Sequence, residues 1–207
     1  MEVAVNRRDF LKGAGAAIVP AAIPATIWES QSQPDLPSRQ VQTPGSPPIA
    51  AVVFDERYAD CKIFAAALVA RGAIAFPAKG DSAQLWYGSL GAHLARSGGR
   101  VAGLTSDSDF VVARACGREL GLQVIYEGAH DGRASNGNLS HAVRSTAGSR
   151  EIVAALAFPG AAWAESLAAA LCRIPLTDRS RNPSASRIVT PRSRNHPGYL
   201  ASWLLGS

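Results

Sequence analysis

The chain has 207 residues, of which 47% are hydrophobic, and a formal net charge of +5. Without its apolar N-terminal segment, a chain of this length forms one domain able to bury a core, and no later apolar run is long enough to span a membrane. The excess positive charge lies in a late segment without aromatic residues that could stack on bases, which argues against a nucleic-acid partner. That segment contributes Arg173, Arg179, Arg181, Arg187, Arg192 and Arg194.

The N-terminal segment begins with a basic motif and continues into an Ala- and Gly-rich apolar run over residues 13–27. It resembles the twin-arginine (Tat) signal peptide of exported bacterial proteins, with Asn6 where serine or threonine is commoner. The resemblance implies export of a folded protein by the Tat translocase and a periplasmic location. An uncleaved signal would anchor the domain to the membrane. The residues that carry the resemblance are Arg7, Arg8, Phe10, Leu11 and Lys12.

Two polar stretches flank the rest of the chain. Residues 28–48 hold five prolines and almost no aliphatic side chains. Such a segment cannot bury enough surface to offset its chain entropy, so we expect a disordered linker there. Residues 177–207 form a basic Pro/Ser/Arg-rich tail, in which the Leu and Trp residues of 198–205 predict a short docked helix. The folded domain is therefore expected over 49–176, after a signal peptide over 1–27.

Five apolar runs predict the strands of this domain. The first of them, IAAVVF, is continuous, as is typical of a strand buried on both faces of a sheet. A Gly/Asn/Ser-rich loop is predicted from Gly128 to about Ser140. The predicted strands are 49–54, 73–77, 100–104, 122–126 and 151–158.

Helices are predicted between these strands. Apolar residues recur at three-and-four spacing over 58–69, Asp81 can cap a second helix, and the polar segment 105–108 can cap a third. A last helix follows Pro159 and Gly160. Strands that alternate with helices predict a three-layer, doubly wound α/β fold with a mostly parallel sheet of about five strands. We expect a Rossmann-like or flavodoxin-like strand order.

Polar residues follow four of the predicted strands. In open parallel sheets, ligands bind beyond the carboxyl ends of the strands, so these residues should meet at one edge. Asp55 is the strongest single candidate, because an acid directly after a buried strand can hold Mg²⁺, bind ribose or attack phosphate. No Asp/His spacing is diagnostic of a metal site, so no metal is predicted and no cofactor is identified. The ligand-binding candidates are Asp55, Arg57, Thr105, Ser106, Asp107, His130 and Asp131.

The sequence lacks several motifs that mark known kinds of binding and catalytic site. No G-x-G-x-x-G follows the first strand, and neither G-x-x-x-x-G-K-[ST] nor G-x-S-x-G occurs in the chain. Classical dinucleotide binding, P-loop binding and an α/β-hydrolase elbow are thus argued against. Asp107 and Asp109 would repel a phosphate from their helix N-terminus, which favours a ligand with hydroxyls or a positive charge. The three cysteines lack Cys-x-x-Cys spacing, although two of them could pair in an oxidising compartment.

Two kinds of function fit these observations. The first is an exported, non-catalytic protein that binds a small ligand or accompanies a larger periplasmic enzyme as an accessory subunit. The second is a small periplasmic hydrolase or redox enzyme that uses the polar cluster at the C-terminal edge of the parallel sheet. The absence of catalytic motifs favours the first.

Overall fold

The structure of the protein is a computed structural model that describes residues 48–78, 81–133, 136–160, 162–175, 183–192 and 196–207. The predicted signal peptide and all of the predicted linker except Pro48 lie outside these ranges. The described residues belong to one compact unit, Gln40–Ser207, and form a seven-stranded sheet with the order β2-β1-β3-β7-β4-β5-β6.

The N-terminal half of the domain matches the predicted alternation of strands and helices. β1 (Ile49–Asp55) pairs in parallel with both β2 (Ile74–Ala78) and β3 (Arg100–Thr105). α1 (Ala59–Val69) connects β1 to β2, and three short helical segments connect β2 to β3. These segments are α2 (Ser82–Leu85), the π-helical turn η2 (Trp86–Leu90) and α3 (Gly91–Ser97). Asp81 caps α2 as predicted, because its side chain accepts a hydrogen bond from the Gln84 N–H at 3.0 Å.

The C-terminal half overturns the predicted fold class. β7 (Tyr199–Gly206) lies between β3 and β4 (Gln123–Asp131) and is antiparallel to both. β5 (Asn138–Ser145) is antiparallel to β4, and β6 (Ser184–Pro191) is antiparallel to β5. The protein therefore has a mixed sheet, and a mostly parallel, Rossmann-like or flavodoxin-like sheet of five strands is wrong.

Two segments form a different kind of element from the one that the sequence predicts. Residues 151–158 are predicted as a strand, but 151–156 belong to α5 (Ser149–Leu156), in which Ile152, Ala155 and Leu156 are buried at helical spacing. A short apolar run does not by itself distinguish a buried strand from a helix. The predicted terminal helix over 198–205 is instead β7, whose residues after Tyr199 are all buried because neighbouring strands and helices cover both edges and faces.

Two predicted loops contain strands. β4 continues through Gly128 to Asp131, and β5 begins at Asn138, so most of the predicted glycine-rich loop forms a hairpin. β5 shows a clear period of two, since Leu139, His141 and Val143 are buried while the residues between them are not. β6 lies within the predicted polar tail and forms the exposed edge of the sheet.

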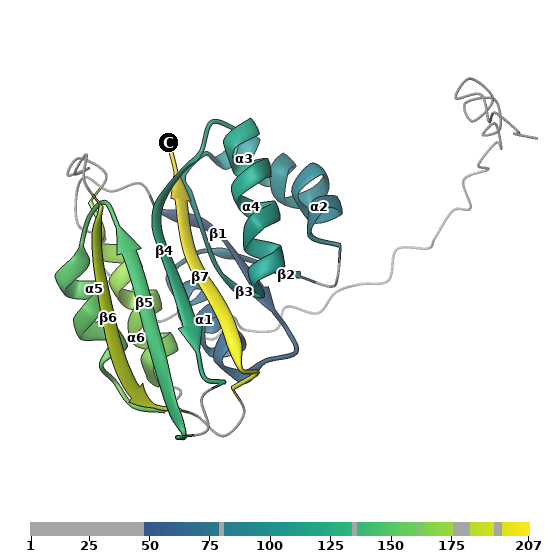
Figure 1. Ribbon diagram of the computed structural model, residues 1–207. Coiled ribbons are helices and arrows are strands. Elements are labelled where there is room, and N and C mark those ends of the chain that lie inside the picture. The colour runs from purple at the N-terminus through teal and green to yellow at the C-terminus, as the bar shows by residue number, and fades with distance from the viewer. Residues whose placement is uncertain (1–47, 79–80, 134–135, 161, 176–182, 193–195) are drawn as a thin grey trace, which may run out of the picture. The chain divides into compact units, whose positions relative to one another are not determined.

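The helices cover the two faces of the sheet unequally (Figure 1). α1, α5 and α6 (Ala162–Arg173) pack on one face along its length. α2, α3 and α4 (Asp107–Glu119) lie on the other face, over the parallel strands and β7. On that second face, α4 borders β4, and no other helix of the described ranges covers β4, β5 or β6. We call the surface of these three strands on this side of the sheet the open face.

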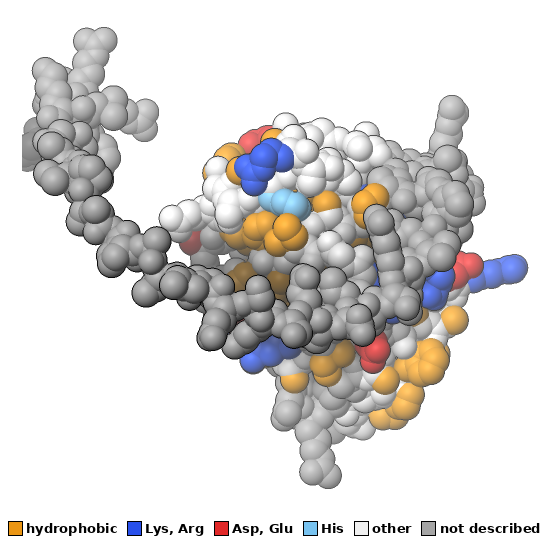
Figure 2. Space-filling view, turned by 180° about the vertical axis from the view of Figure 1, so that it is seen from behind, with side chains coloured by type: hydrophobic (Ala, Val, Ile, Leu, Met, Phe, Trp, Pro, Cys, Tyr) orange, Lys and Arg blue, Asp and Glu red, His pale blue; other side chains and the backbone are white. Residues whose placement is uncertain are grey.

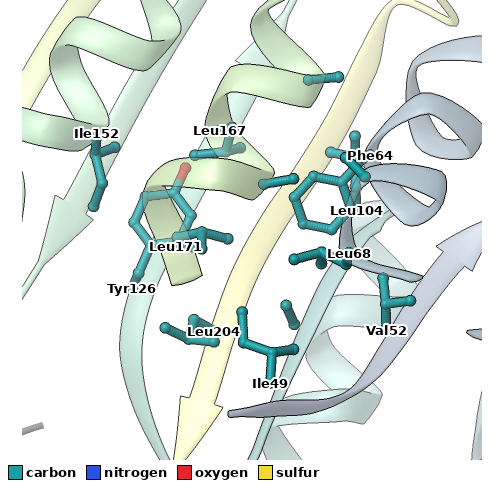
Figure 3. Packing of buried hydrophobic residues seen from close by; sticks show 14 of the residues in the cluster. Ile49, Val52, Phe64, Leu68, Leu104, Tyr126, Ile152, Leu167, Leu171 and Leu204 are labelled. Atoms are coloured by element: carbon teal, nitrogen blue, oxygen red, sulfur yellow. The ribbon is translucent and has the colours of Figure 1, made fainter. Parts of the chain in front are cut away.

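The core lies in two clusters, one on each side of the sheet. On the α1–α5–α6 side, Phe64 and Leu68 of α1 meet Leu167 and Leu171 of α6 above the strands (Figure 3). On the other side, Trp203 of β7 lies against Trp86 and Phe110, with ring centroids 6.2 and 6.3 Å apart. The Trp203 indole N–H donates a hydrogen bond to Thr105 Oγ1 at 3.2 Å. Trp203 therefore joins α4, η2 and β3.

Seen from the α1–α5–α6 side, the coloured part of the surface is mostly hydrophobic or uncharged, with few charged side chains (Figure 2). None of the helices in the described ranges is long and apolar enough to cross a membrane.

Candidate functional site

Asp55, the strongest single candidate in the sequence, is held by its own neighbour. It is buried at the end of β1, and its carboxylate accepts hydrogen bonds from the Arg57 backbone N–H at 3.0 Å and from Arg57 Nη2 at 2.6 Å. Burial opposes ionisation, but the hydrogen bonds and charge of Arg57 outweigh it and hold the pKa of Asp55 below its usual value. This ion pair fixes the turn between β1 and α1.

The polar residues after β3 mainly cap α4. Ser106 is the N-cap and accepts a hydrogen bond from the Asp109 N–H at 3.2 Å, and its hydroxyl donates to Asp109 Oδ2 at 2.7 Å. Ser82 of α2 also donates to the Asp109 carboxylate. Thr105 is buried and bonded to Trp203, whereas Asp107 is exposed and lines a hollow described below.

The predicted constellation does not form a single cluster. Asp55 and Thr105 lie next to each other on β1 and β3, on the side of the sheet that α2 and α4 cover. His130 lies two strands from β3, because β7 is inserted between β3 and β4, and its ring contacts Trp163 on the opposite side. Asp131 is half-buried and paired with Arg133, whose hydrogen bonds lower the pKa of Asp131 to about 2. A ligand-binding role for these residues stays a prediction.

A continuous hydrogen-bonded network is buried in the antiparallel half of the sheet. His130 Nε2 lies 2.6 Å from Ser202 Oγ, which lies 2.7 Å from the Tyr126 hydroxyl. His130 Nδ1 lies 2.7 Å from His141 Nδ1, and His141 Nε2 lies 2.9 Å from Thr190 Oγ1. The network thus crosses β7, β4, β5 and β6.

One direction of proton donation leaves every member of this network with a partner. The Tyr126 hydroxyl donates to Ser202, Ser202 donates to His130, His130 Nδ1–H donates to His141, and His141 Nε2–H donates to Thr190. The reverse direction would leave the Tyr126 hydroxyl proton unused. This order requires both histidines to be neutral. Burial and neighbouring histidines lower the pKa of His130 well below its usual value, and burial lowers that of His141 to about 4.

The network is a structural element of the core. His130, His141 and Ser202 have no exposed surface, and the indole ring of Trp163 lies 4.4 Å from the His130 ring, centroid to centroid. The Trp163 N–H is buried without a hydrogen-bond partner among the described residues. A satisfied buried network of this kind fixes the register of the strands that it joins.

Replacing Ser202 with alanine is expected to lower the free energy of unfolding by about 1–3 kcal/mol, because it leaves both His130 Nε2 and the Tyr126 hydroxyl buried without a partner. Urea unfolding measures the loss. Ser140→Ala on the open face of β5 is the matched control and should change stability by less than about 0.5 kcal/mol. Equal effects of the two substitutions would contradict a stabilising role for the network.

The described residues hold no group of three or more His, Cys, Asp or Glu side chains placed to bind a metal ion. Cys61 and Cys116 are buried, Cys172 is half-buried, and all three are free thiols. Burial raises the pKa of the Cys61 and Cys172 thiols, which makes them poor nucleophiles. The structure therefore brings no two cysteines together as a disulfide.

The open face carries a hollow of about 540 Å³ whose floor is a row of alanines. Ala201, Ala129 and Ala142 lie directly beside one another on β7, β4 and β5. The taller pair Glu127 and Arg144 stands in the next row on one side. Rows on one face of a strand are about 7 Å apart, so the small alanine side chains leave a trough between taller neighbours.

A second hollow of about 560 Å³ adjoins the first. Both are lined by Glu127 and Arg144, whose side chains form an ion pair with Arg144 Nη1 3.7 Å from Glu127 Oε1. The other walls of the second hollow come mainly from the C-terminal part of α4 and from the start of β4. We call the two hollows together the open-face groove. A groove of this size accommodates a small organic molecule.

Sequence reasoning overlooked the open-face groove. Of the seven predicted residues, only Asp107 lines it. The signal that could have indicated it is the alternation in 138–145, which places Ala142 and Arg144 on the face opposite the buried Leu139 and Val143. The contribution of β7 had no such signal, because Ala201 sits in a continuous apolar run and its neighbours across the sheet are distant in sequence.

Comparison with known proteins identifies the N-terminal segment only. Residues 4–24 match the family model of the TAT (twin-arginine translocation) pathway signal sequence. This match confirms the predicted export by the Tat pathway, which involves the Tat translocase. No curated protein and no solved structure matches the chain. The function of the folded domain therefore has to be argued from its surface.

Proposed function

We propose that the protein is a periplasmic, non-catalytic binding protein that holds a small ligand in the open-face groove. The observation that carries the proposal is the alanine row of Ala201, Ala129 and Ala142, which extends from β7 beside α4 onto the open face of β4 and β5. Exposed sheet faces with small side chains in register leave concave surface, and concave surface with a few polar groups is the usual form of a ligand site.

The alternative of a hydrolase or redox enzyme has weaker support. It would need Asp55, Asp107 and His130 around one reacting group, yet Asp55 is bound to Arg57 and His130 is bound within the core network. General acid–base catalysis needs a group within hydrogen-bond reach of the substrate. The accessory-subunit role relies on the same open face, with a protein in place of a small molecule.

Filling the trough tests the proposal. Protein purified after Tat export is incubated with a periplasmic small-molecule extract and examined by native mass spectrometry. We expect a bound small molecule on the natural protein and at least tenfold less on Ala142→Leu, because leucine at position 142 would occupy the trough. Ala92→Leu, on the exposed side of α3, is the matched control and should bind normally.

Two results would count against the proposal. Equal retention by Ala142→Leu and the natural protein would place the ligand elsewhere. The second result is a stoichiometric protein partner that co-purifies with the natural protein but not with Ala142→Leu, while no small molecule is bound. This result would favour the accessory-subunit role.

A further inference from the structure

One stripe of α4 lines the whole open-face groove. Its members recur at helical three-and-four spacing, so they share one face of the helix, and this face borders both hollows. The groove therefore runs along α4, beside residues of β4 and β5. The stripe consists of Asp107, Phe110, Val111, Arg114, Ala115 and Arg118.

The charges along this stripe change sign from one end of α4 to the other, and Arg187 of β6 adds a positive charge beside the alanine floor. Asp107 lies in the first turn of α4, beside the hollow with the alanine floor. Arg114 and Arg118 line the second hollow together with Arg144. Arg114 and Arg118 have no carboxylate partner among the described residues, whereas Arg144 already pairs with Glu127. One end of the groove therefore holds positive charge that the described residues leave unbalanced.

Apolar surface connects the two ends. Phe110 lies at the alanine floor, and Val111 borders the second hollow with 62% of its surface exposed. Leu122 and Val124 add further apolar surface below the arginines. An exposed valine on a helix face beside a groove is a surface that a bound apolar group would cover.

We propose that the ligand of the open-face groove is an amphipathic anion, with its acid group against Arg114, Arg118 and Arg144 and its apolar body along α4 toward Phe110 and the alanine floor. This inference rests on the proposed function and names the class of ligand. Guanidinium groups bind carboxylate and phosphate oxygens in fixed, often bidentate geometry, so the arginine end would select an acid group. Asp107 and Arg187 at the opposite end carry opposite charges, so the direction of the ligand follows from the three arginines that line the second hollow.

The test uses three probes with the same ten-carbon body, namely decanoate, decanamide and decyltrimethylammonium, below their micelle concentrations. Isothermal titration calorimetry measures their affinities for the purified exported protein. We expect decanoate to bind at least tenfold more tightly than decanamide, and the cation to bind most weakly. The preference for decanoate should decrease as salt concentration rises, because the arginines are exposed.

Variants locate the two parts of the ligand. Arg114→Gln/Arg118→Gln should weaken decanoate at least tenfold and leave decanamide unchanged, and Asp107→Asn should not weaken decanoate. Arg96→Gln on α3 is the matched control for loss of an exposed arginine. Ala142→Leu should weaken decanoate and decanamide alike.

The outcomes separate this inference from the proposed function. If decanamide binds as tightly as decanoate and Ala142→Leu weakens both, the groove binds ligands but does not select an acid group, and the inference is overturned. If no probe binds measurably, the inference is likewise overturned, because the ligand class is wrong. If the probes bind and neither Ala142→Leu nor the arginine substitutions change their affinities, the inference and the proposed site both fail.

Discussion

Gly103→Ala is expected to lower the free energy of unfolding by about 3 kcal/mol, the upper part of the usual range for overpacking a core. Gly103 lies in the middle of β3, opposite Trp203 of β7. A methyl group at this position would overlap the Cε2 and Cζ2 atoms of the Trp203 ring. The ring cannot easily move away, because it is fully buried between Trp86 and Phe110. Urea unfolding followed by tryptophan fluorescence measures the loss.

A second substitution tests whether this contact is the cause. Trp203→Leu alone should be destabilising because it leaves a cavity, but it makes room for a side chain at position 103. In the double variant Gly103→Ala/Trp203→Leu, the loss should therefore be clearly smaller than the sum of the two single losses. Additive losses would show that the alanine acts on β3 itself and that the ring does not restrict this position.

Acidification is expected to destabilise the protein between about pH 6.5 and about pH 4. Burial and the charge of His196 lower the pKa of His141 to about 4, and burial and Arg192 lower that of His196 to about 4. In the unfolded chain a histidine titrates near pH 6.5, so within this window the unfolded state binds more protons than the folded state. The free energy of unfolding therefore falls as the pH falls, by up to about 1.4 kcal/mol per pH unit for each such histidine.

The pH slope also assigns the effect to particular residues. His141→Asn removes one titrating group, so the slope of unfolding free energy against pH should decrease by up to about 1.4 kcal/mol per pH unit, whatever the stability of the variant at neutral pH. Urea unfolding over the range from about pH 7 to about pH 5 gives this slope. If the slope is the same in the variant and the natural protein, His141 takes up its proton equally in the folded and unfolded states, and the neutral network described above is wrong.

Local sequence patterns were sufficient for the parallel half of the domain. β1, β3 and α1 each carry a signal within a few residues, such as the continuous apolar run of 49–54 or the three-and-four spacing that ends near Gly72. Asp81 and Ser106 cap their helices through hydrogen bonds within three residues, so the local sequence specifies them as well. The Tat signal is of the same kind, since six adjacent residues carry most of it.

The antiparallel half shows where such patterns stop being sufficient. The run over 151–158 is apolar at nearly every position, and only its contacts with α6 decide that Ile152 and Leu156 lie on one face of a helix. Residues 199–206 have a similar apolar composition but form a strand, because β3 and β4 pair with it through backbone hydrogen bonds on both of its edges. Backbone N–H and C=O groups in a buried segment must be paired, and here two strands distant in sequence supply the partners.

The sequence by itself determined that the protein is exported, that it alternates strands and helices as far as Tyr126, and which residues cap α2 and α4. Only the tertiary structure decided where β7 lies. That placement sets Ala201 beside Ala129 and Ala142, puts His130 on the opposite face from Asp55, and leaves the open face of β4, β5 and β6 largely uncovered by the described helices. The physical reason is that strand pairing joins residues far apart in the chain, so the surface it creates is recorded in no local pattern.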